Sequence, residues 1–145
     1  MALKSIPAAP PGTVIAHSPA STGIYLASPA IARLDDGSLL AKCDEHGPRS
    51  TEKTAGRTRV YRSVDQGATW SQVATLDGIY WASLFAAQGA VWLLGTQRQD
   101  GPIVLRRSDD RGRSWTMPVD GRSGRLRDDG RYHGAPTPVL ESGGR

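Results

Sequence analysis

One octet of residues occurs twice in this chain, and this repeat constrains the fold more than any other feature of the sequence. Residues 63–70 read SVDQGATW, and residues 108–115 read SDDRGRSW, 45 positions further on. Both copies fit the pattern S-x-D-x-G-x-[ST]-W. Each copy follows one strand-like run and precedes another, so each is expected to be a hairpin turn. A repeat of about 40–50 residues is typical of folds built from stacked β units.

The chemistry of the octet agrees with a turn. Glycine takes the positive φ that tight turns need, and an aspartate side chain accepts hydrogen bonds from main-chain N–H groups across a turn. The tryptophan begins the outgoing strand and can fold over the turn. Because both copies occupy one place in the repeat, a structural role is favoured over a catalytic or metal-binding role for their acids. The structural positions predicted are Ser63, Asp65, Gly67, Thr69, Trp70, Ser108, Asp110, Gly112, Ser114 and Trp115.

A second repeated unit sets the frame of the fold. Tyr25-Leu26-Ala27-Ser28, Tyr80-Trp81-Ala82-Ser83 and Tyr132-His133-Gly134-Ala135 recur 55 and then 52 residues apart, and each is expected to open a strand. One unit then reads strand, turn, strand, loop, strand, octet, strand, which describes a four-stranded antiparallel meander. We predict an all-β chain with strands near residues 29–34, 38–42, 58–62, 71–76, 82–87, 90–95, 103–107 and 115–119.

Composition argues against several classes of protein. The chain has 145 residues, a single cysteine (Cys43), 38% hydrophobic residues, and no apolar run near the roughly 18 residues that a membrane helix needs. Its net charge of +4 comes from arginines that often lie beside aspartates, which makes a weak nucleic-acid footprint. One domain without disulfides is therefore expected, with no nucleic-acid or membrane partner. No secretory signal is recognisable in the printed sequence.

The octet is similar to the Asp-box, the repeat of bacterial neuraminidases, and the meander around it resembles a blade of the sialidase propeller. Residues 14–21, 25–41 and 130–133 resemble bacterial exo-sialidase-like proteins. The resemblance implies a partial six-bladed β-propeller of the sialidase type, with about two four-stranded antiparallel blades and the start of a third. It also implies a bacterial protein, secreted or periplasmic in its full-length form, whereas the sequence itself leaves the compartment open.

We expect a single incomplete propeller domain over residues 1–145. It would comprise an N-terminal extension at 1–21, a blade at 22–77, a blade at 78–120 and the start of a third blade at 121–145. Such a piece exposes strand edges and an apolar face. The chain is therefore expected to be the N-terminal fragment of a longer protein whose other blades cover that face, or to complete the ring by self-association.

Topology predicts which end of the strands carries function. In an up-and-down blade, successive connections alternate between the two ends, so the loops between second and third strands, and between blades, lie opposite the octets. The first of these loops is the longest, and long loops on a rigid scaffold often carry chemistry. The candidates at this end are Asp44 and Glu45 as catalytic acids, with His46, Tyr80, Trp81, Arg98, Arg131, Tyr132 and His133 as substrate-binding residues.

The resemblance implies a mechanism for this end of the molecule. Sialidases clamp the substrate carboxylate with arginines, protonate the leaving oxygen with a carboxylic acid, and use a tyrosine as nucleophile. The chain would then be a glycoside hydrolase of the exo-α-sialidase class that acts on terminal sugars of glycans, with no cofactor or metal. Asp44 is favoured over Glu45 as the general acid, because it lies nearer the end of a strand.

One departure from the family pattern leaves an alternative open. The first arginine of the family opens an R-I-P triplet, whereas this chain has Ala27-Ser28-Pro29, and alanine cannot bind a carboxylate. Arg98 and Arg131 are the best placed residues to compensate. The alternative to an enzyme is a non-catalytic propeller that binds glycans or serves as a scaffold.

Overall fold

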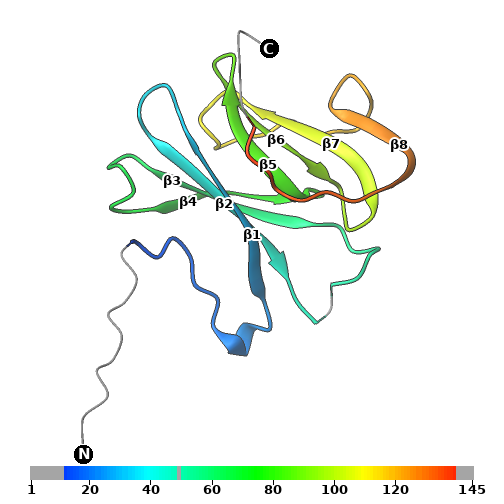
Figure 1. Cartoon of the computed structure of the whole chain (residues 1–145), viewed down its shortest axis with the longest axis horizontal. Helices are drawn as coiled ribbons and strands as arrows, with labels where there is room; N and C mark the ends of the chain where they lie inside the picture. The colour runs from blue at the N-terminus through cyan, green and yellow to red at the C-terminus, as the bar shows by residue number, and fades with distance from the viewer. Residues whose placement is uncertain (1–11, 49, 140–145) are drawn as a thin grey trace, which may run out of the picture.

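The computed structural model describes residues 12–48 and 50–139, which form two four-stranded antiparallel sheets with sequential strand order (Figure 1). The first sheet contains β1 (Tyr25–Arg33), β2 (Leu39–His46), β3 (Arg57–Ser63) and β4 (Ser71–Asp77). The second contains β5 (Tyr80–Ala87), β6 (Ala90–Thr96), β7 (Gly101–Ser108) and β8 (Arg125–Tyr132). In these two ranges the 3-10 turn η1 (Ala20–Thr22) is the only helix, and no helix is long and apolar enough to cross a membrane. The predicted all-β meander is confirmed.

Both octets form the turns that the sequence predicts. In the first, Asp65 accepts the main-chain N–H of Thr69 at 2.9 Å and its hydroxyl at 2.6 Å, while Ser63 Oγ accepts the N–H of Gly67 at 2.8 Å. The second octet repeats these three bonds at 2.8, 2.6 and 2.8 Å. In each copy the tryptophan ring N–H donates to the carbonyl of the octet glycine. Both octets lie at the same end of the strands, as expected.

The apolar core lies between the two sheets, which meet where β1 and β5 lie side by side. Alternation along the strands sends every second side chain into this layer. Its buried members are Leu34, Leu40, Val60, Leu76, Ile79, Ala82, Leu84, Val91, Leu93 and Val104. The second octet joins the packing: Trp115 lies against the core, and a Cβ at Gly112 would stand 3.0 Å from the methyl groups of Leu40.

The fourth strand of the second sheet is not where the sequence placed it. The strand predicted near 115–119 is wrong, because in that range only Thr116 donates a main-chain bond to β7, to the Arg107 carbonyl at 2.9 Å. Pro118 has no N–H to donate, and Asp120 bends the chain by accepting two main-chain N–H groups of the following turn. The chain then returns as β8, inside the segment expected to begin a third blade.

The second repeated unit is offset from its predicted frame. The sequence equates Tyr25 with Tyr80, whereas the strand register equates Ala27 with Tyr80. Ala27 and Tyr80 are each followed by a bulge residue whose φ lies in the left-handed region. These are Ser28, with φ of 52°, and Trp81, with φ of 47°. A bulge adds a residue to one strand, and a match of short sequence words does not reveal it.

The third predicted copy of that unit does not open a strand. Tyr132 instead ends β8, opposite Gly101 of β7. Residues 133–139 then run past β5, where the N–H of Thr137 donates to Ser83 Oγ at 3.0 Å; this is the red segment of Figure 1. The last residues of the segment expected to begin a third blade, 140–145, lie outside the described residues.

Candidate functional site

The ends of the strands opposite the octets bring four aromatic rings together. The Tyr80 hydroxyl, at the start of β5, lies 2.5 Å from Nδ1 of His46 at the end of β2. Trp81 packs beside Tyr80 with ring centroids 4.9 Å apart, and His133 meets Trp81 edge-on at 4.2 Å. Burial lowers the pKa of His46 and raises that of Tyr80, so both groups are uncharged at neutral pH. We call these four residues the aromatic cluster; the sequence had predicted all of them at this end.

Asp44 is a buried structural residue of β2 and does not lie on the loop where the sequence placed it. Its side chain has no exposed surface and forms an ion pair with Lys42 at 3.0 Å, equally enclosed. The carboxylate also accepts the hydroxyl of Thr58 at 2.6 Å and the N–H of Trp81 at 2.8 Å. These bonds tie the first sheet to the bulge of the second. A carboxylate enclosed in this way cannot reach a substrate, which argues against its favoured role as general acid.

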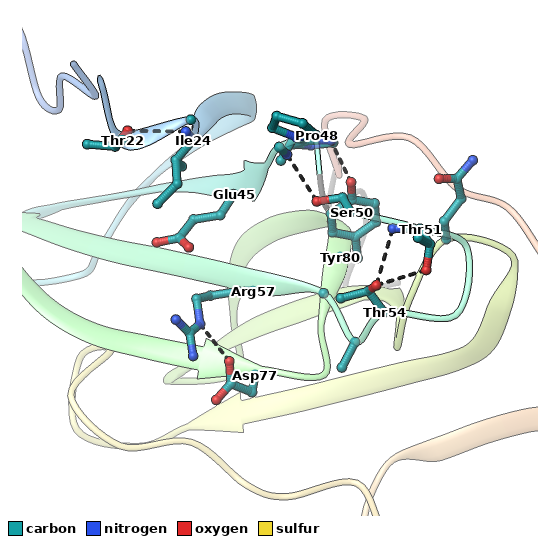
Figure 2. A pocket seen from close by; sticks show the side chains of 16 residues that line it. Thr22, Ile24, Glu45, Pro48, Ser50, Thr51, Thr54, Arg57, Asp77 and Tyr80 are labelled. Carbon is teal, nitrogen blue, oxygen red and sulfur yellow. Dashed lines mark hydrogen bonds and ion pairs between the residues drawn. The ribbon is translucent and has the colours of Figure 1, made fainter. Parts of the chain in front are cut away.

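A pocket of about 380 Å³ lies beside the aromatic cluster and is drawn in Figure 2. Its walls come from the segment before β1, the end of β2, the β2–β3 loop and the start of β5. The wall is mixed: Ile24, Pro48 and Tyr80 contribute apolar surface, and hydroxyl groups come from Thr22, Ser50, Thr51 and Thr54. Three of the predicted site residues, Glu45, His46 and Tyr80, line it. An apolar wall with hydroxyl and carboxylate groups suits a ligand that carries both C–H and O–H groups.

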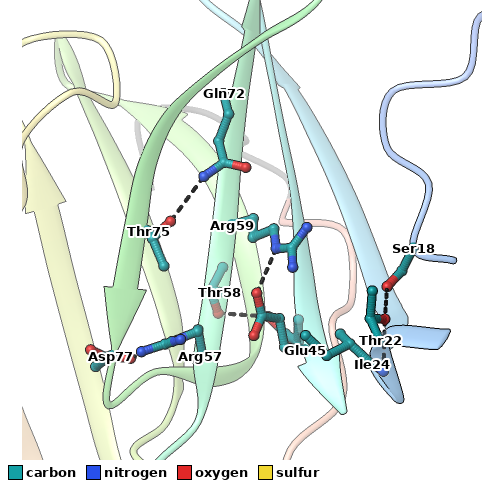
Figure 3. Close-up of polar contacts among 11 residues, drawn as sticks. Ser18, Thr22, Ile24, Glu45, Arg57, Thr58, Arg59, Gln72, Thr75 and Asp77 are labelled. Atoms are coloured by element: carbon teal, nitrogen blue, oxygen red, sulfur yellow. Dashed lines mark hydrogen bonds and ion pairs between the residues drawn. The ribbon is translucent and has the colours of Figure 1, made fainter. Parts of the chain in front are cut away.

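Two ion pairs involve residues of this pocket wall, and Figure 3 shows both. Arg59 Nε lies 2.5 Å from Glu45, and Arg57 Nε lies 2.8 Å from Asp77. The bond to Asp77 raises the pKa of Arg57, and the bond to Glu45 raises that of Arg59. The sequence gave no signal that Arg57 and Asp77 form a pair. Their contact joins the first residue of β3 to the last residue of β4.

The remaining predicted binding residues lie outside the pocket wall. Arg131 is held by two acids, Glu52 at 3.1 Å and Asp100 at 3.4 Å, and Asp100 also contacts the His133 ring. The Tyr132 hydroxyl donates to Asp129 at 2.6 Å, so it is directed back to its own strand. Arg98 forms a main-chain bridge with Ala55 and has no ion pair within 12–48 and 50–139.

Metal-binding geometry is lacking in the part of the chain that the structure describes. No three side chains of the histidine, cysteine, aspartate and glutamate types converge there as a metal ion would require. This end of the strands presents carboxylates, hydroxyl groups and the neutral His46–Tyr80 pair.

Comparison by sequence finds no relative: no protein-family model matches the chain, and no curated protein is significantly similar to it. Comparison by structure does find similar proteins. The GH93 α-L-arabinofuranosidase of Fusarium graminearum, in complex with arabinobiose, superposes with a TM-score of 0.53 at 20% identity, over 65% of this chain and 32% of that one. The α-L-arabinofuranosidase Arb93A of Fusarium graminearum, with an iminosugar inhibitor, gives 0.50 at 21% identity, over 62% and 30%.

A sialidase is also among the structures found. The Hadza microbial sialidase Hz136 gives a TM-score of 0.48 at 20% identity, over 63% of this chain and 25% of that chain. The chain thus spans about a third of the length of the arabinofuranosidases that it matches. At these identities the likeness establishes the fold alone. The two sheets of this chain are two blades of a partial β-propeller.

Proposed function

We propose that this chain is part of a propeller glycoside hydrolase that acts on terminal sugars of glycans. The observation that carries the proposal is the placement of two carboxylates, Glu45 and Asp77, in the wall of one pocket at the loop end of the blades. Most glycoside hydrolases use a pair of carboxyl groups on either side of the scissile bond. The arabinofuranosidase of the same fold was solved with arabinobiose, a sugar ligand.

Glu45 is the better candidate of the two acids that the sequence singled out. Its side chain is 16% exposed and lines the pocket, whereas that of Asp44 is enclosed. Arg59 holds the Glu45 carboxylate in one orientation from behind the pocket, and fixed geometry matters because a misplacement of about 1 Å can cost some 10²-fold in rate. Held as an ion pair, Glu45 suits the nucleophile or base of the reaction. Asp77 is the second candidate carboxyl group; it is also ion-paired, with Arg57, and 68% of its side chain is exposed.

A non-catalytic glycan-binding propeller is the second candidate function. It is favoured by Ala27, which stands where the sialidase resemblance expects an arginine, and by the enclosure of Asp44. The finer assignment to the exo-α-sialidase class depends on arginines that clamp the carboxylate of the substrate.

The test is hydrolysis of aryl glycosides by the complete natural protein and by its Glu45→Gln and Asp77→Asn variants. If the pocket is catalytic, both variants should lose at least about 10²-fold in kcat/KM while retaining their fold, a loss in the range that general acid or base catalysis supplies. Asp128→Asn, which removes an exposed carboxylate of β8, is the matched control. Sugar binding without hydrolysis by the parent protein would instead support the non-catalytic propeller.

A further inference from the structure

We infer that the pocket selects uncharged sugars and discriminates against sugars that carry a carboxylate, such as sialic or uronic acids. The inference rests on the proposed function, since it names the substrate class for that same pocket. It follows from the charges in the wall, from the state of His46 and from the partners of Arg57, Arg59 and Arg131.

The described residues of the pocket wall offer no cation that is free to meet an incoming carboxylate. Arg57 is the only arginine or lysine among them, and its guanidinium is already bonded to Asp77. Glu45 and Asp77 give the wall two negative groups against that one positive group. Arg59, just behind the wall, is bonded to Glu45 at 2.5 Å. Among the described residues of the wall, a carboxylated sugar would therefore meet two carboxylates and no unpaired cation.

The His46 imidazole in the pocket wall does not change this balance of charges. Burial lowers the pKa of His46, so it is neutral near pH 7, and its Nδ1 is occupied by the Tyr80 hydroxyl. The strand position where the sialidase resemblance expects an arginine carries Ala27. Of the two candidates to replace that arginine, Arg131 is shared between Glu52 and Asp100, and Arg98 does not line the pocket.

The uncharged groups of the wall fit the hydroxyl groups of a neutral sugar. Four side-chain hydroxyls and the amide of Gln99 border the pocket beside the apolar faces of Ile24, Pro48 and Tyr80. Thr51 and Thr54 hold each other at 2.9 Å, which fixes two of these hydroxyls in place. Hydroxyl groups both donate and accept, as the groups on a sugar ring do.

The experiment measures binding of matched pairs of methyl glycosides that differ only at C6: galactoside with galacturonide, and glucoside with glucuronide, along with methyl arabinofuranoside and the methyl glycoside of sialic acid. The neutral member of at least one pair should bind at least about tenfold tighter than its acid, which corresponds to about 1.4 kcal/mol. The discrimination should shrink at high salt, because salt screens the repulsion between the acid and the wall.

One variant and its control test the physical reason. Asp77→Asn leaves Arg57 without a charged partner, so binding of the acidic sugar should improve while binding of the neutral sugar changes less. The ratio of neutral to acidic affinity should therefore fall by at least about threefold. Asp128→Asn releases Arg125 in the same manner on the exposed face of β8, away from the pocket, and should leave the ratio unchanged.

The outcomes separate this inference from the proposed function. Tighter binding of the acidic member by the parent protein overturns the inference and leaves the glycoside hydrolase proposal standing; loss of that binding in Arg98→Ala would then identify the cation responsible. An unchanged ratio of neutral to acidic affinity in Asp77→Asn also overturns the inference, because the charges of the wall would then not cause the discrimination. Failure of every sugar to bind overturns both.

Discussion

At the scale of single residues, the two octet aspartates contribute stability that depends on pH. The hydroxyl of Thr69 is the main donor that lowers the pKa of Asp65 from 3.8 to about 2, and Ser114 does the same for Asp110. Because the folded pKa is the lower one, this stabilisation is complete above about pH 3.8 and is lost as the pH falls through 2.

We therefore expect the thermal midpoint of the parent chain to fall more between pH 5 and pH 2.5 than that of Asp65→Asn or Asp110→Asn. Both variants should bind sugars normally, since the octets lie at the end opposite the pocket. A thermal scan at each pH, together with a binding assay at pH 7, measures both effects. Equal pH dependence in parent and variants would show that the octet hydrogen bonds do not stabilise the fold.

A second residue-scale prediction concerns the enclosed pair of Lys42 and Asp44. Burial lowers the pKa of Lys42, and Asp44 is the partner that offsets this by favouring the charged ammonium. Removal of one partner leaves a buried charge, so Asp44→Ala should lower the free energy of unfolding by about 3–5 kcal/mol. Urea unfolding followed by fluorescence measures it.

The second sheet supplies the matched control for that pair. Leu94 and Thr96 occupy the positions equivalent to Lys42 and Asp44, because the same register runs from Ser63 and Ser108. The double variant Lys42→Leu with Asp44→Thr should lose less stability than Asp44→Ala, since it leaves no unpaired charge. A double variant as unstable as the single one would mean that the bond from Asp44 to the bulge of β5, and not the charge, is what matters.

At the scale of elements, the attachment of β8 depends on one glycine. Gly124 has φ of 113°, and a Cβ there would lie 2.1 Å from the Leu105 carbonyl oxygen. The Gly124 carbonyl accepts the N–H of Leu105 at 2.8 Å. This is the first main-chain hydrogen bond to β7 after the irregular segment 117–123. Gly124→Ala should therefore detach the start of β8 and make the Leu105 amide exchange faster with solvent.

Hydrogen exchange followed by NMR tests this, with Gly130→Ala as the control. A Cβ at Gly130 would meet only the Tyr132 ring, at an ordinary 3.5 Å. That variant should leave the Leu105 amide protected. Unchanged protection in Gly124→Ala would show that β8 tolerates a shift of its first residue.

At the scale of the whole molecule, the outer face of the first sheet is open and apolar. Ile31 is 59% exposed there, and a groove of about 590 Å³ with a largely apolar wall includes Val14, Leu26 and Tyr61. Within the chain, the equivalent face of the second sheet is covered by the first. We expect the 145-residue chain to associate at micromolar concentration through this face.

Light scattering of the parent chain and of Ile31→Lys measures the association. The variant should shift the chain toward monomer, whereas Val64→Lys, at a residue that is 73% exposed in the first octet, should not. A parent chain that stays monomeric at micromolar concentration would contradict the expectation that a partial propeller needs further blades or further copies.

Short-range hydrogen bonds explain which features could be predicted from the amino-acid order alone. The octet turns close through hydrogen bonds between residues two to four apart, so Asp65 and its partners are visible in a window of eight letters. The alternation of strand and turn then gave the all-β meander, and its up-and-down order indicated the end at which His46, Tyr80 and Trp81 meet.

The remaining features could not be predicted, because they depend on contacts between residues far apart in the chain. Asp44 is enclosed by Thr58 and Trp81, which lie 14 and 37 positions away, and no local pattern distinguishes such an acid from the neighbouring Glu45 that faces the pocket. The pairing of Arg57 with Asp77 spans 20 positions and depends on β3 and β4 ending together. The position of β8 depends on where the irregular segment 117–123 returns to pair with β7. Burial and register are properties of the packed sheets and not of a single strand.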